Sequence, residues 1–427
     1  MKRTMLALAL CALLGLSCGT KDETVKLRDW NFGGKPRMIE WLRQRVELFE
    51  QSHAGIRVEQ SQKSWNMIRE LLYADFSVGT GPDVVNVHAN YAAEFGGAGY
   101  YYPINTFPDF KEVSSWYVPL LMESTRYKDN YYGLPSSGIA FVLVCNKELF
   151  DREGISPPRT WSEFREAARR LTKDTDGDGT VDQYGLVLLG GDKGGFAYRL
   201  IPFFLKAGAE VMSDDLKTIR FNSPAGLSAL KLLADMYQVD HSITPGFLAY
   251  QLTEINDLFC SNKVAMSIEG PWFRGMVDDK SPGKKIYTVP VPVPDERIGV
   301  YDTAPTLQDM VMYAINARTK YPAQAWELIK FLRNEEADMA WIREDLGALA
   351  TTRHAIESRE AKALDDLPMY INELKYAKPW PAHPSMIAIA SDIFTPYTEK
   401  AIVGELSCQA ALDMAAREAQ DMIEGKK

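Results

Sequence analysis

Four aspartates lie close together in the sequence with the spacing of calcium ligands. They are Asp174, Asp176, Asp178 and Asp182, at positions 1, 3, 5 and 9 of an EF-hand-like loop. Such loops hold calcium through carboxylate oxygens, but Gly185 stands at position 12, where a bidentate glutamate is expected. Two interpretations stay open: a structural calcium site, or a polar turn whose aspartates accept hydrogen bonds from nearby amides. We expect no other cofactor.

Signatures of catalysis are missing from the sequence. It contains no H-E-x-x-H, no G-x-S-x-G and no G-x-x-x-x-G-K-[ST] motif, and its five histidines are dispersed. We therefore expect a protein that is not an enzyme. The carboxylate pair of a glycosidase is recognised by its separation in space, so a secreted glycan hydrolase stays open as an alternative.

Aromatic side chains carry the positive signal for binding. The chain has nine tryptophans and twenty tyrosines. An aromatic plane packs against the C–H face of a sugar ring, while neighbouring polar groups meet its hydroxyls. Trp272, beside Gly270 and Pro271, is the strongest candidate for such a platform, and Trp65 and Tyr198 come next. Because large rings also fill cores, packing inside a lobe is the alternative role of each.

The N-terminus has the parts of an export signal. Lys2 and Arg3 precede an apolar run from Met5 to Leu16. This run is too short to span a membrane, and its basic start is typical of a secretory signal. The pattern predicts a cleaved signal peptide over residues 1–17 and an exported, extracytoplasmic protein.

The residue after this signal predicts a lipid anchor. Cys18 follows Ser17 directly and resembles the acylated cysteine of bacterial lipoproteins, although Gly15 stands where that motif usually has leucine. Residues 18–23 would then form a short tether to the membrane, on its periplasmic or cell-surface face. The alternative is an ordinary cleaved signal with an incidental cysteine.

The size of the mature chain predicts its number of lobes, and its net charge predicts which partners it does not bind. Removing the signal leaves 410 of the 427 residues, which is more than one hydrophobic core usually serves, so we expect two lobes. The formal charge is -9, and the loss of two signal-peptide cations takes it to about -11. A chain this acidic is not expected to bind nucleic acid.

Apolar strands alternate with amphipathic helices, which is typical of βαβ units and a largely parallel sheet. The periodicity predicts strands at 25–30, 56–60 and 83–87. Proline, glycine and capping residues mark the helix ends, and Thr160 with Glu163 forms a capping box. Helices are predicted at 36–53, 68–78, 161–171, 224–237, 322–333 and 407–423.

The order of several short motifs resembles a known family. They are Trp30–Gly34, Gly81–Val85, Tyr132–Pro135, Asn146–Phe150, Pro158–Phe164 and Gly270–Trp272. Together they resemble the bacterial extracellular solute-binding proteins of ABC importers (family 1), in the sugar-binding, maltose-binding-protein-like branch and in lipoprotein form. The resemblance spans nearly the whole mature chain.

The resemblance implies an α/β fold of the two-lobed periplasmic-binding-protein type (type II). Each lobe would be a mostly parallel sheet flanked by helices, and the chain would cross between lobes at hinges near 135–139 and 306–309. The implied first lobe is 24–137 plus 308–337, and the second is 138–307 plus 338–427.

The resemblance also implies a ligand cleft between the lobes, where loops follow the carboxyl ends of strands. The implied ligand-binding residues are Phe32, Trp65, Asn90, Tyr91, Ser136, Ser137, Tyr198, Trp272 and Asp309. For Ser136 and Ser137 a simple hinge position is the alternative, and for Asp309 a surface position. Several family positions differ in this chain, so maltose itself is not carried over as the ligand.

The function implied is capture of a sugar, an oligosaccharide or a related polyol, with delivery to ABC permease subunits. We expect a monomer held at the membrane by its lipid. A binding module that reports to a sensor instead of a transporter is a further alternative.

Overall fold

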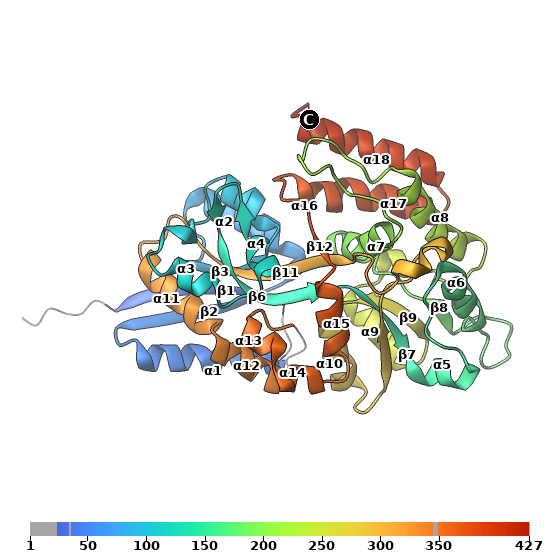
Figure 1. Ribbon diagram of the computed structural model, residues 1–427, viewed down its shortest axis with the longest axis horizontal. Coiled ribbons are helices and arrows are strands. Elements are labelled where there is room, and N and C mark those ends of the chain that lie inside the picture. Colours follow the sequence, from blue (N-terminus) through green and yellow to red (C-terminus); the bar gives the residue numbers. More distant parts are fainter. Residues whose placement is uncertain (1–23, 34–35, 345–348, 427) are drawn as a thin grey trace, which may run out of the picture.

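The computed structural model describes residues 24–33, 36–344 and 349–426. The predicted signal peptide and the whole predicted tether, with Cys18, lie outside these residues. The described chain forms two lobes side by side, each with its own sheet and covering helices (Figure 1). The two-lobed α/β architecture is therefore confirmed.

The first lobe is built on a six-stranded sheet with strands from distant parts of the chain. Its strands are β1 (Val25–Phe32), β2 (Ile56–Lys63), β3 (Val84–His88), β6 (Gly133–Ala140), β11 (Leu307–Ile315) and β12 (Lys378–Pro379). Its helices include α1 (Pro36–Ser52), α2 (Ile68–Val78), α4 (Pro119–Glu123), α11 (Pro322–Leu332), α12 (Glu335–Arg343), α13 (Arg353–Glu357) and α14 (Arg359–Ala363).

The second lobe has a four-stranded sheet. Its strands are β7 (Val142–Asn146), β8 (Tyr184–Leu186), β9 (Val264–Glu269) and β10 (Ile286–Val289). Its helices include α5 (Lys147–Glu153), α6 (Trp161–Arg170), α7 (Lys193–Lys206), α8 (Pro224–Gln238), α9 (Leu252–Cys260), α10 (Trp272–Lys280), α15 (Leu367–Leu374), α17 (Thr395–Ile402) and α18 (Cys408–Ile423).

Local sequence explains where these elements begin and what they bury. On α1 the buried side chains Leu42, Val46 and Phe49 recur at three- and four-residue steps, which gives one apolar stripe against the sheet. The predicted capping box of α6 is confirmed, because Thr160 Oγ1 accepts from the Glu163 amide at 3.3 Å while the Glu163 carboxylate accepts from the Thr160 amide. The predicted strands and helices are all present, with ends shifted by three residues or fewer.

The first-lobe sheet is mostly parallel, as expected, whereas the second-lobe sheet is mostly antiparallel. In the first lobe β1 is parallel to β2 and β3, but β11 is antiparallel to both β3 and β6. In the second lobe only β8 and β9 pair in parallel, and β7 runs against both β9 and β10. The reason for the antiparallel pairs is the path of the chain: β6 leads directly into β7 in the second lobe, and β11 returns to the first lobe in the direction opposite to β3 and β6.

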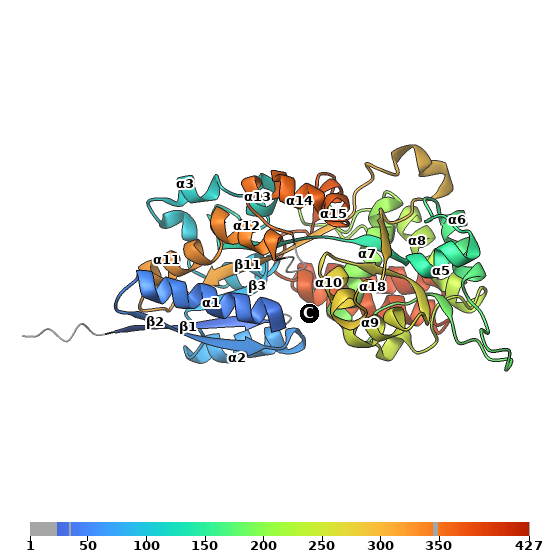
Figure 2. The same cartoon turned by 90° about the horizontal axis from the view of Figure 1, so that it is seen from below.

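These strand directions decide which way the carboxyl ends of the strands face. Since β6 runs into the second lobe, β1 and β3 share its direction and end toward that lobe. Since β7 runs away from the first lobe, β8 and β9 end toward it. The carboxyl ends of strands from both sheets therefore meet between the lobes, and Figure 2 shows β11 running through this junction.

The predicted boundary at residue 337 lies too early in the chain. Asp338 is fully buried and accepts from the amides of Thr351 and Thr352 at 2.6 and 2.7 Å. Thr351 Oγ1 in turn donates to the Pro135 carbonyl at 3.2 Å, and the Arg353 amide donates to a first-lobe carbonyl. These buried bonds hold residues 338–344 and 349–353 on the first lobe, and the described chain reaches the second lobe again at α15 (Figure 1).

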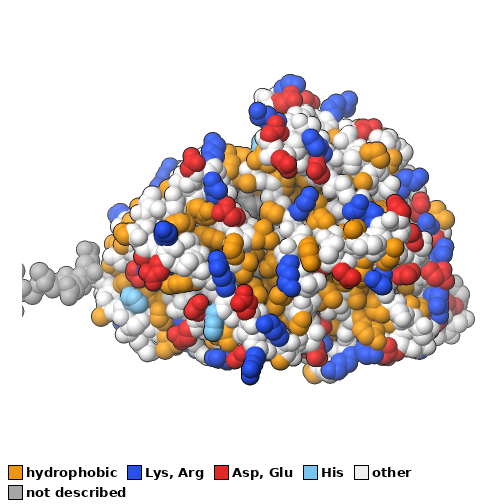
Figure 3. Space-filling view, viewed as in Figure 1, with side chains coloured by type: hydrophobic (Ala, Val, Ile, Leu, Met, Phe, Trp, Pro, Cys, Tyr) orange, Lys and Arg blue, Asp and Glu red, His pale blue; other side chains and the backbone are white. Residues whose placement is uncertain are grey.

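The outer surface carries charges of both signs. Lysine and arginine side chains alternate with aspartate and glutamate across the face in Figure 3, with apolar side chains between them. Among the helices of the described residues, none combines the length and apolar character needed to cross a membrane.

Candidate functional site

A cavity of about 590 Å³ lies between the lobes, where the carboxyl ends of the strands meet. Its walls include residues that follow β1, β2 and β3 of the first lobe and residues that follow β8 and β9 of the second. All nine predicted ligand-binding residues line it: Phe32, Trp65, Asn90, Tyr91, Ser136, Ser137, Tyr198, Trp272 and Asp309. Their contact with a ligand stays a prediction.

Trp65 forms the aromatic wall of the first lobe. It lies in a short 3-10 turn after β2 and is half-buried, with its ring 5.6 Å from that of Phe32. Phe32 is 2% exposed and thus supports Trp65 from behind. Gly33 has a φ of +60°, and a Cβ there would lie 2.0 Å from Trp65 Nε1, so this position requires glycine.

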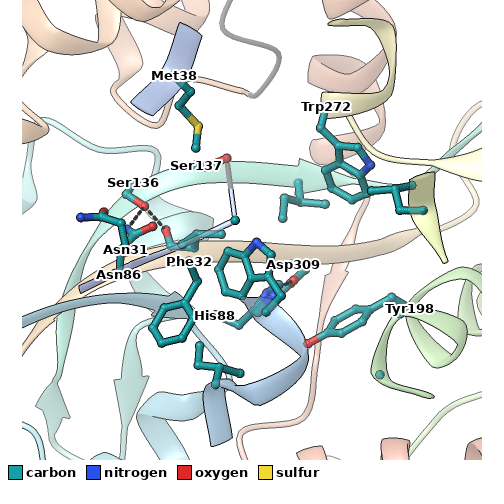
Figure 4. Close-up of a pocket in the computed structure, with 18 of the residues that line it drawn as sticks. Asn31, Phe32, Met38, Asn86, His88, Ser136, Ser137, Tyr198, Trp272 and Asp309 are labelled. Carbon is teal, nitrogen blue, oxygen red and sulfur yellow. Dashed lines mark hydrogen bonds and ion pairs between the residues drawn. The ribbon is translucent and has the colours of Figure 1, made fainter. Parts of the chain in front are cut away.

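Trp272 forms the facing wall on the second lobe (Figure 4). It begins α10 directly after β9 and is half-buried, whereas a core tryptophan would be covered. The ring of Phe141 meets its ring edge-to-face at 5.8 Å, and the Arg199 guanidinium lies 5.8 Å from its centroid. These contacts fix the indole plane at the cavity.

His88 and Asp309 form a polar pair in the cavity wall (Figure 4). Because a carboxylate only accepts, His88 Nδ1–H donates to Asp309 Oδ2, at 2.6 Å. The imidazole lies between Trp65, 4.6 Å away, and Tyr198, 5.5 Å away and nearly parallel. Burial by itself lowers the pKa of His88, but the charge and hydrogen bond of Asp309 outweigh it, so the pKa of His88 is raised.

A hydrogen bond between Asn90 and Tyr198 crosses the cleft between the lobes. Asn90, which follows β3 in the first lobe, donates from Nδ2 to the Tyr198 hydroxyl on α7 of the second lobe at 2.7 Å. Burial raises the pKa of Tyr198 well above its ordinary value, which keeps the phenol neutral. Trp380 supports the Tyr198 ring edge-to-face at 5.2 Å.

The polar residues of β6, the strand that leads into the second lobe, differ in how free they are to contact a ligand. Between Val311 and Met312 of β11 the register shifts, so Ser136 on β6 has no opposing residue. The Ser136 hydroxyl donates to the Val311 carbonyl at 3.0 Å and accepts from Asn86 at 2.8 Å, while Ser137 is half-buried. Tyr91 is 4% exposed, so its ring belongs chiefly to the first-lobe core.

Some cavity residues were missed from the sequence. Asn86 and His88 alternate with the buried valines of β3 and continue into Asn90, so a polar stripe at every second residue was the signal available. Asn31 and Asp192 carried no comparable pattern. Asn31 donates to Asp29 on the same strand at 2.7 Å and accepts from the Tyr313 hydroxyl on the distant strand β11 at 2.9 Å.

The aspartate-rich loop lies away from the cavity in the second lobe. Carboxylate oxygens of Asp174, Asp176 and Asp182 come within 4.8 Å of one another, and Asp178 is outside this group. Backbone amides of Gly177 and Gly179 donate to Asp174 at 2.6 and 2.7 Å, which lowers its pKa. These bonds are those of a polar turn, and calcium binding there stays a prediction.

The chain matches one protein family over most of its length. The family model described as bacterial extracellular solute-binding protein matches residues 35–339. The chain belongs to this family. A protein of Brucella abortus (strain 2308) whose name calls it a binding protein is 26% identical to this solute-binding protein over 289 residues. The match covers 67% of this chain and 66% of the Brucella protein, so it spans about two thirds of that relative.

Solved structures share the fold of this solute-binding protein. A solute-binding protein of an ABC transporter from Thermotoga lettingae, bound with α-D-tagatose, has a TM-score of 0.82 and 22% identity, covering 93% of this chain and 100% of that one. The GacH receptor of Streptomyces glaucescens, solved unliganded and with acarbose, also has a TM-score of 0.82, with 20% identity over 94% of this chain and 99% of that one.

Proposed function

We propose that this solute-binding protein captures a sugar, an oligosaccharide or a related polyol between its lobes and delivers it to ABC permease subunits. The observation that carries this is that Trp65 of the first lobe and Trp272 of the second lobe line the same cavity. Two aromatic planes suit the C–H faces of sugar rings, and the amide, imidazole and carboxylate between them suit the hydroxyls.

The two-lobed geometry supplies the mechanism of capture. A ligand that contacts Trp65 on the first lobe and Trp272 on the second gains both sets of contacts only when the lobes are together, so it favours the closed state. A ligand that contacts one lobe alone would shift nothing. The Asn90–Tyr198 hydrogen bond adds to the closed state directly. Capture and release therefore need no covalent bond to be made or broken.

The comparisons support a carbohydrate as the ligand class. The maltotriose-binding protein of Pyrococcus abyssi is 20% identical over 316 residues, 73% of this chain and 64% of that protein. The Thermotoga protein was solved with α-D-tagatose and the Streptomyces receptor with acarbose. None of these ligands is assigned to this chain, because its own cavity residues decide specificity.

Export and anchoring complete the proposal. Residues 1–17 would direct export, and acylation of Cys18 would hold the two lobes near the permease. A lipoprotein of Streptomyces antibioticus is 26% identical over 185 residues, 40% of each chain. Metabolic labelling with a palmitate analogue tests the anchor: Cys18→Ser should lose the label, and labelling of that variant would contradict it.

Ligand capture is tested on residues 19–427 by thermal shift against mono- and oligosaccharides, polyols and amino acids. A ligand at a hundred times its dissociation constant adds about 2.7 kcal/mol, which raises the melting temperature by several degrees. Mass spectrometry then shows whether the ligand is returned unaltered. A consumed ligand would support the glycan hydrolase, and responses confined to amino acids would contradict a carbohydrate site.

A matched pair of variants ties binding to the cavity. Trp272→Ala removes one aromatic wall and should weaken the binding of the best saccharide at least about tenfold, or 1.4 kcal/mol. Trp161→Ala removes a tryptophan that is also half-buried on the second lobe, but which bonds to the Pro292 carbonyl outside the cavity. It should leave affinity unchanged. Equal losses in both variants would refute the assignment.

A further inference from the structure

Both arginines that line the cavity are neutralised within the protein. Arg199 Nη2 lies 2.6 Å from Glu269 Oε2, and the two side chains are 6% and 0% exposed. Arg333 Nη2 lies 2.7 Å from Asp338 Oδ1, and these side chains are 2% and 0% exposed. Because each guanidinium faces a buried carboxylate, neither offers a free positive charge to a ligand.

The negative charges of the two wall carboxylates, Asp309 and Asp192, are only partly neutralised by positively charged partners. Asp309 is 4% exposed and pairs with His88. Asp192 is half-buried, and its Oδ1 accepts from the Gly195 amide at 3.0 Å as the N-cap of α7. Within the described residues Asp192 has no ion-pair partner. When Arg199 and Arg333 are counted together with their partners Glu269 and Asp338, which lie behind the wall, the charges sum to -1 with His88 protonated and to -2 with His88 neutral.

We propose that this cavity selects neutral and amine-bearing saccharides against acidic ones, and that Asp192 and Asp309 set the selection. The inference rests on the proposed function, since it names the class of saccharide. A uronate or sugar phosphate would lose its hydration and meet carboxylates, with no free cation among the described wall residues. An ammonium group would meet Asp192, and a neutral hydroxyl could donate to either carboxylate.

The test uses two sets of probes that differ in charge. One set is glucose, glucosamine and glucuronate, and the other is cellotriose, the chitosan trimer and the C6-oxidised cellotriose. Calorimetric titration of the exported protein should give binding to the neutral or amine member, with the uronate at least about tenfold weaker. A uronate that binds as tightly as its neutral counterpart overturns the inference and leaves the proposed function standing. Silence of both whole sets removes the inference together with these saccharide ligands.

Charge-neutral variants locate the selection. Asp192→Asn keeps the N-cap of α7, since asparagine caps as well as aspartate. It should raise the affinity of the uronate relative to the neutral member about tenfold. Asp214→Asn is the matched control, because Asp214 is exposed in the second lobe outside the cavity wall, and it should leave the ratio unchanged. An unchanged ratio in Asp192→Asn, or an equal change in Asp214→Asn, refutes the role of Asp192.

Discussion

The hydrogen bond between Asn90 and Tyr198 should set how readily the lobes close. It is 2.7 Å long and joins the end of β3 in the first lobe to α7 in the second. Tyr198→Phe removes the hydroxyl and leaves the ring contacts with His88 and Trp380, since these involve only the aromatic carbons. The substitution therefore perturbs one bond that exists only when the lobes are together.

The size of the effect follows from the surroundings of this bond. A neutral hydrogen bond contributes about 1 kcal/mol net. Tyr198 and Asn90 are both half-buried, so water can replace the lost hydroxyl in part. A loss of about 1 kcal/mol reduces the closing equilibrium constant about fivefold. Where the closed state is the minor one before ligand binds, ligand affinity falls by the same factor.

Two assays read this change independently. Where the closed state is well populated without ligand, small-angle X-ray scattering should show a larger radius of gyration in Tyr198→Phe. Where the closed state is the minor one, calorimetry should show about fivefold weaker saccharide binding. Tyr376→Phe is the control, because Tyr376 is 41% exposed and lies outside the cavity wall. Unchanged scattering together with unchanged affinity in Tyr198→Phe would refute the bridging role.

Three further predictions concern the first lobe and the aspartate-rich loop. Gly33→Ala should displace the Trp65 indole and shift its fluorescence, whereas Gly154→Ala, at a similar φ of +62° with no atom within 4 Å of the new Cβ, should change only stability; equal fluorescence in both would contradict this. Burial raises the pKa of Asp29 to about 6, so its contribution to stability is full below pH 3.8 and is lost as pH rises through 6. Relative to Asp29→Asn, the wild type should lose about 3 kcal/mol of unfolding free energy between pH 3.5 and 7 in urea titrations, and parallel pH profiles would contradict the buried acid. Millimolar calcium should raise the melting temperature of the wild type but not of Asp176→Asn if the loop is a calcium site, and no response in the wild type would leave it a polar turn.

Local chemistry made the elements of the fold predictable. The stripe Leu42, Val46 and Phe49 and the capping pair Thr160 and Glu163 act within a few residues, so their outcome does not depend on the rest of the chain. The same holds for the valines of β3. The order of short motifs then indicated the two-lobed arrangement, and with it the strand ends where Trp65, Asn90 and Trp272 meet in one cavity.

Contacts between distant segments were decided by the tertiary structure alone. Residues 338–344 and 349–353 stay on the first lobe because the buried Asp338 accepts hydrogen bonds from the amides of Thr351 and Thr352. The antiparallel course of β7 follows from the side on which the chain enters the second lobe. Neither leaves a periodic signal, because both depend on which surfaces the folded chain brings together.

The sequence by itself indicated nine residues of the cavity wall, because its strand ends and short motifs resemble those of a known family. Only the tertiary structure decided their chemistry. His88 and Asp309 are 221 residues apart, and Asn90 and Tyr198 are 108 apart. The charge left at Asp192 is likewise known only once Arg199 is seen to pair with Glu269. Electrostatic and hydrogen-bond energies depend on distances of a few ångströms in space, and spacing along the chain does not fix those distances.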